Sequence, residues 1–326
     1  MAVTLREVAE RAGVSRSAVS RTFTEGASVS ERTRARVEKA ALELGYRPNL
    51  LARSLTTRRT ALIGLVADNF RNPIFLEIFD LFTRGLQDRG LRPLLVNLSG
   101  QTDPGESLSL LRAYSVDGVV VASSTLPPAF ARAFAEAGVP VVHAFGRPTD
   151  AGGLSVVGID NRAVGTLAAQ TLLSRGYRRI GFLGGPASAT STEDRLSGFR
   201  AALPSAVLTD VRFAAAYSFA AGQAEMSRAL EDGPAEAYFC GDDVLSIGAL
   251  SAIEDRGLAV PGDIGLIGFN DMEMAGWHNI GLTTIRQPIP DIVAAAIARM
   301  CEMLEGDDAP ASTLFDCAVV ERGTLR

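Results

Sequence analysis

Short apolar runs alternate with longer amphipathic segments over most of the chain. Such runs lie at residues 61–66, 94–96, 118–121, 139–142, 180–183, 237–240 and 264–268. After the first run, apolar residues recur at helical spacing from Pro73 to about Arg89. Apolar strands separated by helices predict parallel sheets with helices on both faces, and the length fits two such sheets.

The first 45 residues have helical spacing instead. Three helices are expected to begin at Thr4, Ser15 and Ser30, whose side chains can cap them, and Glu7 completes a capping box with Thr4. They should end at Gly13, at Arg21 and, after Glu31 to Leu44, at Gly45. Two short helices joined by a tight glycine turn predict a helix-turn-helix.

The second helix carries candidate DNA contacts. A helix that enters the major groove presents its first turn to base edges, which here holds Arg16 and Ser17. Ser15, Ser20 and Arg21 are better placed for phosphates, which fix register rather than sequence. The alternative is a three-helix interaction module with a solvated arginine face.

Charge is distributed unevenly along the chain. Residues 1–60 hold 12 of the 32 basic and 6 of the 37 acidic residues, a net of +6 that leaves -11 for the remainder. A basic end on an acidic body is typical of proteins that bind nucleic acid through one end.

Composition and motifs exclude several classes. With 326 residues, 47% of them hydrophobic, the chain is long enough for two or three domains. No apolar run reaches 18 residues and the start lacks the apolar core of a signal peptide, so we expect a cytoplasmic protein without a membrane span rather than a secreted sugar-binding protein. The three scattered cysteines favour buried free thiols. Without a phosphate-binding loop, nucleophile elbow or metal-ligand cluster, we expect no enzyme, no catalytic residue, no metal and no cofactor.

The segment 47–59 links the first domain, residues 1–46, to the body. Residues 49–55 can form a helix of two turns, which is marginal alone and would order only against DNA and a second copy of the chain.

These segments resemble a known family. Residues 4–21, 45–49 and 52–55 are similar to the lactose/purine repressor (LacI/GalR) family of transcriptional regulators. The resemblance implies that Arg16 and Ser17 read bases and that Leu55 wedges into the minor groove, which kinks DNA. We expect Asn49 and Arg53 to contact DNA in the same segment. Ala18 departs from the family, where many members carry threonine.

The resemblance continues through the body, at residues 72–75, 117–119, 160–161, 195–199 and 282–288. It implies the two-lobed periplasmic-binding-protein fold, with two doubly wound parallel sheets. The expected N-terminal lobe is 60–160 with 290–320, and the C-terminal lobe is 161–289 with 321–326. Three crossings should join them, near 159–161, 288–290 and 320–322.

An effector site is expected between the lobes, because ligands of such sheets bind beyond the carboxyl ends of the strands. Positions matched to the family or lying at strand ends give these candidates: Asn69, Phe75, Arg195, Tyr217, Asp242, Asn270 and Trp277. Five of them have a structural alternative. Phe75 could belong to the core, Tyr217 could cover a loop and Trp277 could pack its own loop. Asp242 could cap a helix, and Arg195 could form an ion pair.

Two positions indicate the chemistry of the ligand. Where relatives often carry asparagine this chain has Asp242, and where they often carry aspartate it has Asn270. A carboxylate accepts hydrogen bonds only, so Asp242 favours hydroxyl or amine donors over phosphates. We therefore expect a small neutral sugar, polyol or nucleoside-like effector. One helix-turn-helix offers few base contacts, so a homodimeric repressor on a palindromic operator is expected.

Overall fold

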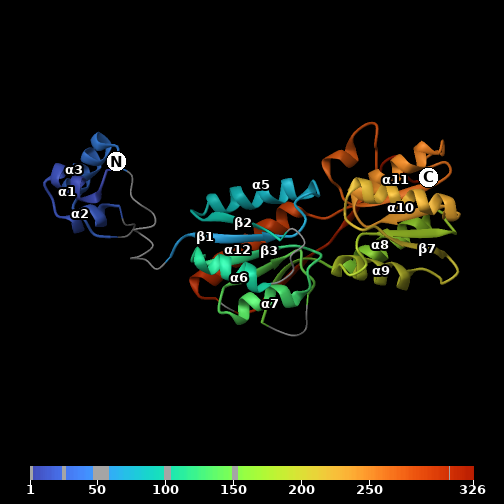
Figure 1. Cartoon of the computed structure of the whole chain (residues 1–326), viewed down its shortest axis with the longest axis horizontal. Helices are drawn as coiled ribbons and strands as arrows, with labels where there is room; N and C mark the ends of the chain where they lie inside the picture. Colours follow the sequence, from blue (N-terminus) through green and yellow to red (C-terminus); the bar gives the residue numbers. More distant parts are fainter. Residues whose placement is uncertain (1–2, 24–26, 47–58, 99–103, 149–152, 308) are drawn as a thin grey trace. The chain divides into compact units, whose positions relative to one another are not determined.

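The computed structural model describes residues 3–23, 27–46, 59–98, 104–148, 153–307 and 309–326. These fall into two compact units, residues 1–60 and 61–326, which are described separately (Figure 1). Within the described residues, no helix is long and apolar enough to cross a membrane. The predicted helix over 49–55 lies outside the described residues.

The first unit contains the helices α1 (Leu5–Ala12), α2 (Arg16–Thr22) and α3 (Glu31–Leu44). Their predicted caps are confirmed. Thr4 and Glu7 form a capping box, and the hydroxyls of Ser15 and Ser30 each accept a hydrogen bond from a backbone N–H of the first turn. Gly13 ends α1 with a φ of 61°, which costs a residue without a side chain little. The helices enclose a small core of Val8, Ala9, Ala12, Val19, Val37, Ala40 and Ala41.

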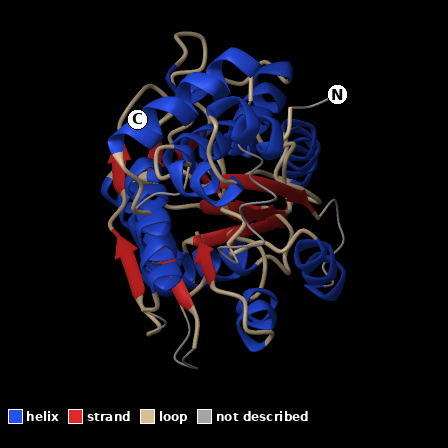
Figure 2. Ribbon diagram, turned by 90° about the vertical axis from the view of Figure 1, so that its left-hand side faces the viewer, coloured by secondary structure: helices blue, strands red, loops and turns tan. Residues whose placement is uncertain are grey.

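The N-terminal lobe is a parallel sheet between helices (Figure 2). Its order is β11-β5-β4-β3-β1-β2. The strands are β1 (Leu62–Ala67), β2 (Arg92–Asn97), β3 (Gly118–Ala122), β4 (Val141–Ala144), β5 (Ser155–Ile159) and β11 (Ser312–Phe315). The helices are α5 (Ile74–Gln87), α6 (Pro104–Ala113), α7 (Pro128–Glu136) and α12 (Ile289–Glu305). Because side chains alternate along β3, Val120 joins the core beneath α5 and α12, whereas Val121 joins the core on the opposite face.

The C-terminal lobe repeats this plan. Its sheet has the order β12-β10-β9-β8-β6-β7, and β12 alone runs antiparallel to its neighbour. The strands are β6 (Ile180–Gly184), β7 (Leu208–Phe213), β8 (Ala237–Cys240), β9 (Gly265–Asn270), β10 (Thr284–Arg286) and β12 (Ala318–Val320). The helices are α8 (Asn161–Ser174), α9 (Thr190–Ala202), α10 (Phe219–Asp232), α11 (Asp243–Asp255) and the short 3₁₀ turn η1 (Glu273–Gly276).

Three connections join the lobes, and one differs from expectation. The first lies at Asp160, between β5 and α8, and the second spans residues 287–288, between β10 and α12. The third passes through residues 316–317, between β11 and β12. The expected crossing at 320–322 is therefore wrong, and so is the end of the N-terminal lobe at residue 320. Residues 318–320 already pair with β10 in the C-terminal sheet.

The three cysteines are free thiols. Cys240 is buried in β8, whereas Cys301 and Cys317 are half-buried. Among the described residues, no group of three or more His, Cys, Asp or Glu side chains is arranged to hold a metal ion.

Candidate nucleic-acid interface and interlobe cavity

Helix α2 presents a polar, exposed face. The side chains expected on DNA are all exposed there: Ser15, Arg16, Ser17, Ser20 and Arg21. Ser15 is already engaged as the helix cap, because its hydroxyl accepts from the N–H of Ala18 at 3.2 Å.

The arginines of this unit divide into two groups. Arg11 is paired with Glu43 at 2.7 Å, and Arg36 donates to the carbonyl oxygen of Ala12. Arg16 and Arg21 make no hydrogen bond or ion pair with any described residue. Two unpaired cations on the helix expected in the major groove fit contacts to base edges and phosphates.

A cavity lies between the two lobes of the second unit. Its empty space is about 580 Å³, open solvent at the mouth included. Segments at the carboxyl ends of strands supply most of its wall, as expected for this sheet topology. The N-terminal lobe contributes Asp68, Asn69, Asn72, Ile74, Phe75, Ile78, Ser123, Ser124, Thr125, Phe145 and Ile159. The C-terminal lobe contributes Asn161, Arg195, Tyr217, Asp242, Asn270 and Gln287.

Arg195 extends from α9 into this cavity and is buried. Its Nε donates to Oδ1 of Asn161 at 2.8 Å, and its Nη1 donates to the carbonyl oxygen of Gly241 at 2.5 Å. The guanidinium lies 3.9 Å from the centre of the Phe269 ring. Burial lowers the pKa of Arg195, although the nearby Tyr217 and Asp242 act in the opposite direction. Neutral acceptors and a ring hold the guanidinium, and among the described residues it has no ion-pair partner.

Asp242 follows β8 and has both carboxylate oxygens occupied. Oδ1 accepts from the N–H of Val244 at 2.7 Å, which caps α11. Oδ2 accepts from Nδ2 of Asn72 at 2.9 Å and from Nδ2 of Asn270 at 2.8 Å. Burial raises the pKa of Asp242 to about 6, with the donors and Arg195 opposing that shift. Asp242 is thus a helix cap and also a link between the lobes.

Asn270 ends β9 in an uncommon backbone conformation. Its φ is 116°, in a region that non-glycine residues rarely adopt. Its Oδ1 accepts from Nε2 of Gln287 at 2.6 Å, while its Nδ2 donates to Asp242. Both ends of the amide are therefore fixed, so its orientation in the cavity wall is defined.

Two aromatic residues complete the wall. The hydroxyl of Tyr217 forms a hydrogen bond of 2.6 Å with Oγ1 of Thr192, and its ring packs against Gly185, where a Cβ would lie 2.4 Å from the ring. Phe75 belongs to the core of the N-terminal lobe and also lines the cavity, so both interpretations of this residue hold. Its ring centre lies 5.6 Å from that of Phe79.

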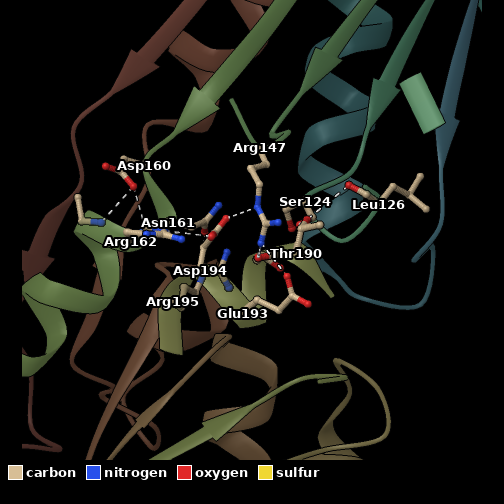
Figure 3. A network of polar contacts seen from close by, with 12 residues as sticks. Ser124, Leu126, Arg147, Asp160, Asn161, Arg162, Thr190, Glu193, Asp194 and Arg195 are labelled. Atoms are coloured by element: carbon tan, nitrogen blue, oxygen red, sulfur yellow. Dashed lines mark hydrogen bonds and ion pairs between the residues drawn. The ribbon is translucent and has the colours of Figure 1, made fainter. Parts of the chain in front are cut away.

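The lobes touch beside the cavity. Figure 3 shows Arg147, which follows β4, reaching α9 of the opposite lobe. Its Nε donates to Asp194 at 2.6 Å, and its Nη2 donates to Glu193 and to the carbonyl oxygen of Thr190, each at 2.9 Å. The hydroxyl of Thr190 in turn donates to the carbonyl oxygen of Ser124 at 2.9 Å. These contacts hold the two lobes together in the described conformation.

The architecture has relatives over its whole length. Residues 4–49 match the model of bacterial regulatory proteins of the lacI family, and residues 169–325 match that of the periplasmic binding protein-like domain. All of the chain aligns, at 30% identity, with 97% of the transcriptional repressor CytR from Escherichia coli K12. The chain belongs to the LacI family of bacterial regulatory proteins.

Solved structures of this family share the fold. The lac repressor dimer bound to operator and the anti-inducer ONPF is similar with a TM-score of 0.88, at 26% identity and 99% coverage of both chains. The complex of the transcriptional regulator CelR with cellobiose is similar with a TM-score of 0.73, at 29% identity and 99% coverage of both chains. The chain is thus a transcriptional regulator with a DNA-binding helix-turn-helix, and its relatives are not enzymes.

Within this family member, the expected effector residues are not all together. The cavity wall contains six of them: Asn69, Phe75, Arg195, Tyr217, Asp242 and Asn270. Trp277 is not among its lining residues. It is 52% exposed and lies with Leu76 and Asp271 in a separate outer groove. The structure therefore gives Trp277 no place in the cavity, because the turn η1 directs residue 277 to that groove.

Sequence reasoning missed other wall residues. Thr125 lines the cavity but was not expected there. Asp68 directly follows β1, at a strand end where ligand contacts were expected. Asn72, Asn161 and Gln287 belong to segments that carry the family resemblance, and this signal could have identified them. The expected DNA contacts Asn49, Arg53 and Leu55 lie outside the described residues.

Proposed function

We propose that the chain is a dimeric repressor that binds a palindromic operator and responds to a small neutral sugar, polyol or nucleoside-like effector held between its lobes. The observation that carries this proposal is the cavity wall. It combines the amides of Asn69 and Asn270, the guanidinium of Arg195 and the rings of Phe75 and Tyr217. Amides and hydroxyls suit the donor and acceptor pattern of a polyol, and aromatic rings suit its apolar face.

Two relatives support this ligand class and assembly. The CelR structure contains cellobiose, and the lac repressor structure is a dimer on its operator. In the present chain, β2 is the edge strand of the N-terminal sheet, and its Leu95 is exposed. Leu76 on α5, the helix that packs against β2, is also exposed. An exposed edge with large apolar side chains suits contact with a second copy.

Effector binding would act through lobe closure. Arg147 and Asn72 already join the lobes beside and within the cavity. A ligand that contacts both walls favours the closed arrangement by its differential affinity for the two states. We propose that closure alters the affinity of the dimer for its operator. An operator affinity that is the same with and without effector would contradict this step.

The test uses the full-length protein. A palindromic operator is selected from random duplex DNA, and its complex is weighed by mass photometry. A thermal-shift screen then compares D-ribose, D-galactose, cellobiose and cytidine with glucose 6-phosphate and hypoxanthine. The proposal expects a dimer on the operator and stabilisation by one of the neutral hydroxylated compounds. Stabilisation by the phosphate or the free base alone would overturn the ligand class, and binding as a monomer would overturn the assembly.

A further inference from the structure

Asp68 carries an unsatisfied oxygen at the cavity. This residue follows β1, and its side chain lines the cavity wall. Its Oδ2 accepts a hydrogen bond from the hydroxyl of Thr125, whereas its Oδ1 is buried without any hydrogen-bond partner. Across the described part of the chain, it is the only buried side-chain oxygen in that condition.

The neighbouring acceptors are in a different state. Both oxygens of Asp242 are occupied, by Asn72, Asn270 and the N–H of Val244. The amide oxygen of Asn161 accepts from Arg195, and that of Asn270 accepts from Gln287. Of the carboxylate oxygens in the cavity wall, Oδ1 of Asp68 is therefore the one that can accept a hydrogen bond from a ligand without displacing a donor of the protein.

The Asp68 carboxylate is also held in place. The hydroxyl of Thr125 donates to Oδ2 of Asp68, and the same hydroxyl oxygen lies 3.1 Å from Oγ of Ser123. The carbonyl oxygen of Thr125 accepts from the backbone N–H of Thr190, which belongs to the opposite lobe. The C-terminal lobe thus contacts the residue that holds the carboxylate, so a ligand bound to the carboxylate would affect lobe closure.

An unpaired carboxylate oxygen out of water is costly, and a donor from the ligand removes that cost. We infer that Asp68 selects the effector by accepting a hydrogen bond from one of its hydroxyl groups through Oδ1. The inference rests on the proposed function of the cavity and deepens it. It requires a hydroxyl at a defined point of the ligand on the N-terminal lobe side, and it disfavours an anionic group there.

The experiment is a thermodynamic cycle that removes the Asp68 carboxylate from the protein and single hydroxyl groups from the ligand, separately and together. Isothermal titration calorimetry measures D-ribose, D-galactose and cytidine, with their monodeoxy analogues, against the wild type and Asp68→Asn. The amide keeps an acceptor for Thr125 but replaces the free oxygen with a donor. We expect Asp68→Asn to weaken the bound parent compound about 10- to 100-fold, the range for a hydrogen bond to a charged group. One deoxy analogue should be equally weak on both proteins, because it lacks the contacted hydroxyl.

Two controls separate the outcomes. Asp80→Asn removes the same charge from the exposed surface of α5 and should leave the affinity unchanged. Unliganded Asp68→Asn should melt within a few degrees of the wild type. Equal affinity of the parent for both proteins overturns the inference, as does a lower melting temperature with unchanged affinity, which would make Asp68 structural. If none of these compounds binds the wild type, both the proposed ligand class and the role of Asp68 are refuted. Binding to the operator is tested independently by the selection and mass photometry described above.

Discussion

Asn72 of the N-terminal lobe donates a hydrogen bond of 2.9 Å to Asp242 of the C-terminal lobe, inside the cavity. The Oδ1 of Asn72 meanwhile accepts from the N–H of Ile74 at the start of α5. One amide therefore orients the entry to α5 and joins the lobes. The two residues are 170 positions apart in the sequence, and the tertiary arrangement of the lobes brings them together.

Asn72→Asp should open the lobes in a pH-dependent manner. The new carboxylate keeps the acceptor for Ile74 but faces Asp242, and two adjacent carboxylates cannot both ionise cheaply. After division by the intrinsic exchange rate at each pH, we expect weaker protection of residues 190–195 at pH 8 than at pH 5. Asn72→Ala, which removes the bond without adding charge, is the control, and its protection should depend little on pH. The same protection in both variants at each pH would contradict this role.

Asp242 predicts a pH dependence of stability. Because burial raises the pKa of its carboxyl from 3.8 to about 6, the folded state holds a proton that the unfolded state releases between those values. Its contribution to stability therefore falls as pH rises from about 4 to above 6, by about 3 kcal/mol at most. Asp242→Asn, which does not titrate, should lack this fall. Chemical denaturation at pH 4.5 and 7.5 measures both, and parallel changes in the two proteins would refute the shift.

Arg147 should contribute to closure, and hence to effector affinity. It spans the lobes to Asp194 at 2.6 Å, whereas Arg162 contacts Asp194 at 3.4 Å from within the same lobe. Arg147→Ala should weaken effector binding about 2- to 5-fold, a range consistent with partly exposed ion pairs. Arg162→Ala is the matched control and should have little effect. The interpretation fails if calorimetry shows equal losses for the two variants.

Arg16 and Arg21 should affect DNA binding in different ways. Arg16→Ala should cost about 1–3 kcal/mol on the selected operator and much less on random DNA, because a base contact is lost. Arg21→Ala should weaken both alike and make the salt dependence shallower, as loss of a phosphate contact does. Arg11→Ala, whose arginine is already paired with Glu43, is the control. Loss of affinity on both DNAs for Arg16→Ala would argue against base reading.

Local signals predicted much of the fold. The caps at Thr4, Ser15 and Ser30 and the apolar runs of β3 and β8 were identified, because caps and buried strands depend on neighbouring residues. The central strand β5 was not predicted. The edge strand β7 was not predicted, because its polar residues Asp210 and Arg212 interrupt any apolar run. The third crossing was misplaced because two residues separate β11 from β12, and no local pattern distinguishes that gap from a loop within one lobe.

The site could be predicted only in part. Strand ends and family positions indicated Asn69, Asp242 and Asn270, because the topology of parallel sheets fixes where such residues lie. Pairings between lobes, such as Arg147 with Asp194, depend on the tertiary arrangement and leave no signal in either segment. Trp277 lies in an outer groove, and no local pattern in its loop indicates on which side of the lobe that loop lies.

The central claim is that occupancy of the cavity controls operator binding. Fluorescence anisotropy with the selected operator, with and without the sugar or nucleoside identified by thermal shift, tests it most directly. The account predicts that the compound changes the operator Kd of the wild type at least 5-fold, an ordinary coupling between linked sites. Arg195→Ala should bind unliganded operator normally but lose the response. An operator Kd unchanged at saturating ligand, or an equal response in Arg195→Ala, would contradict it.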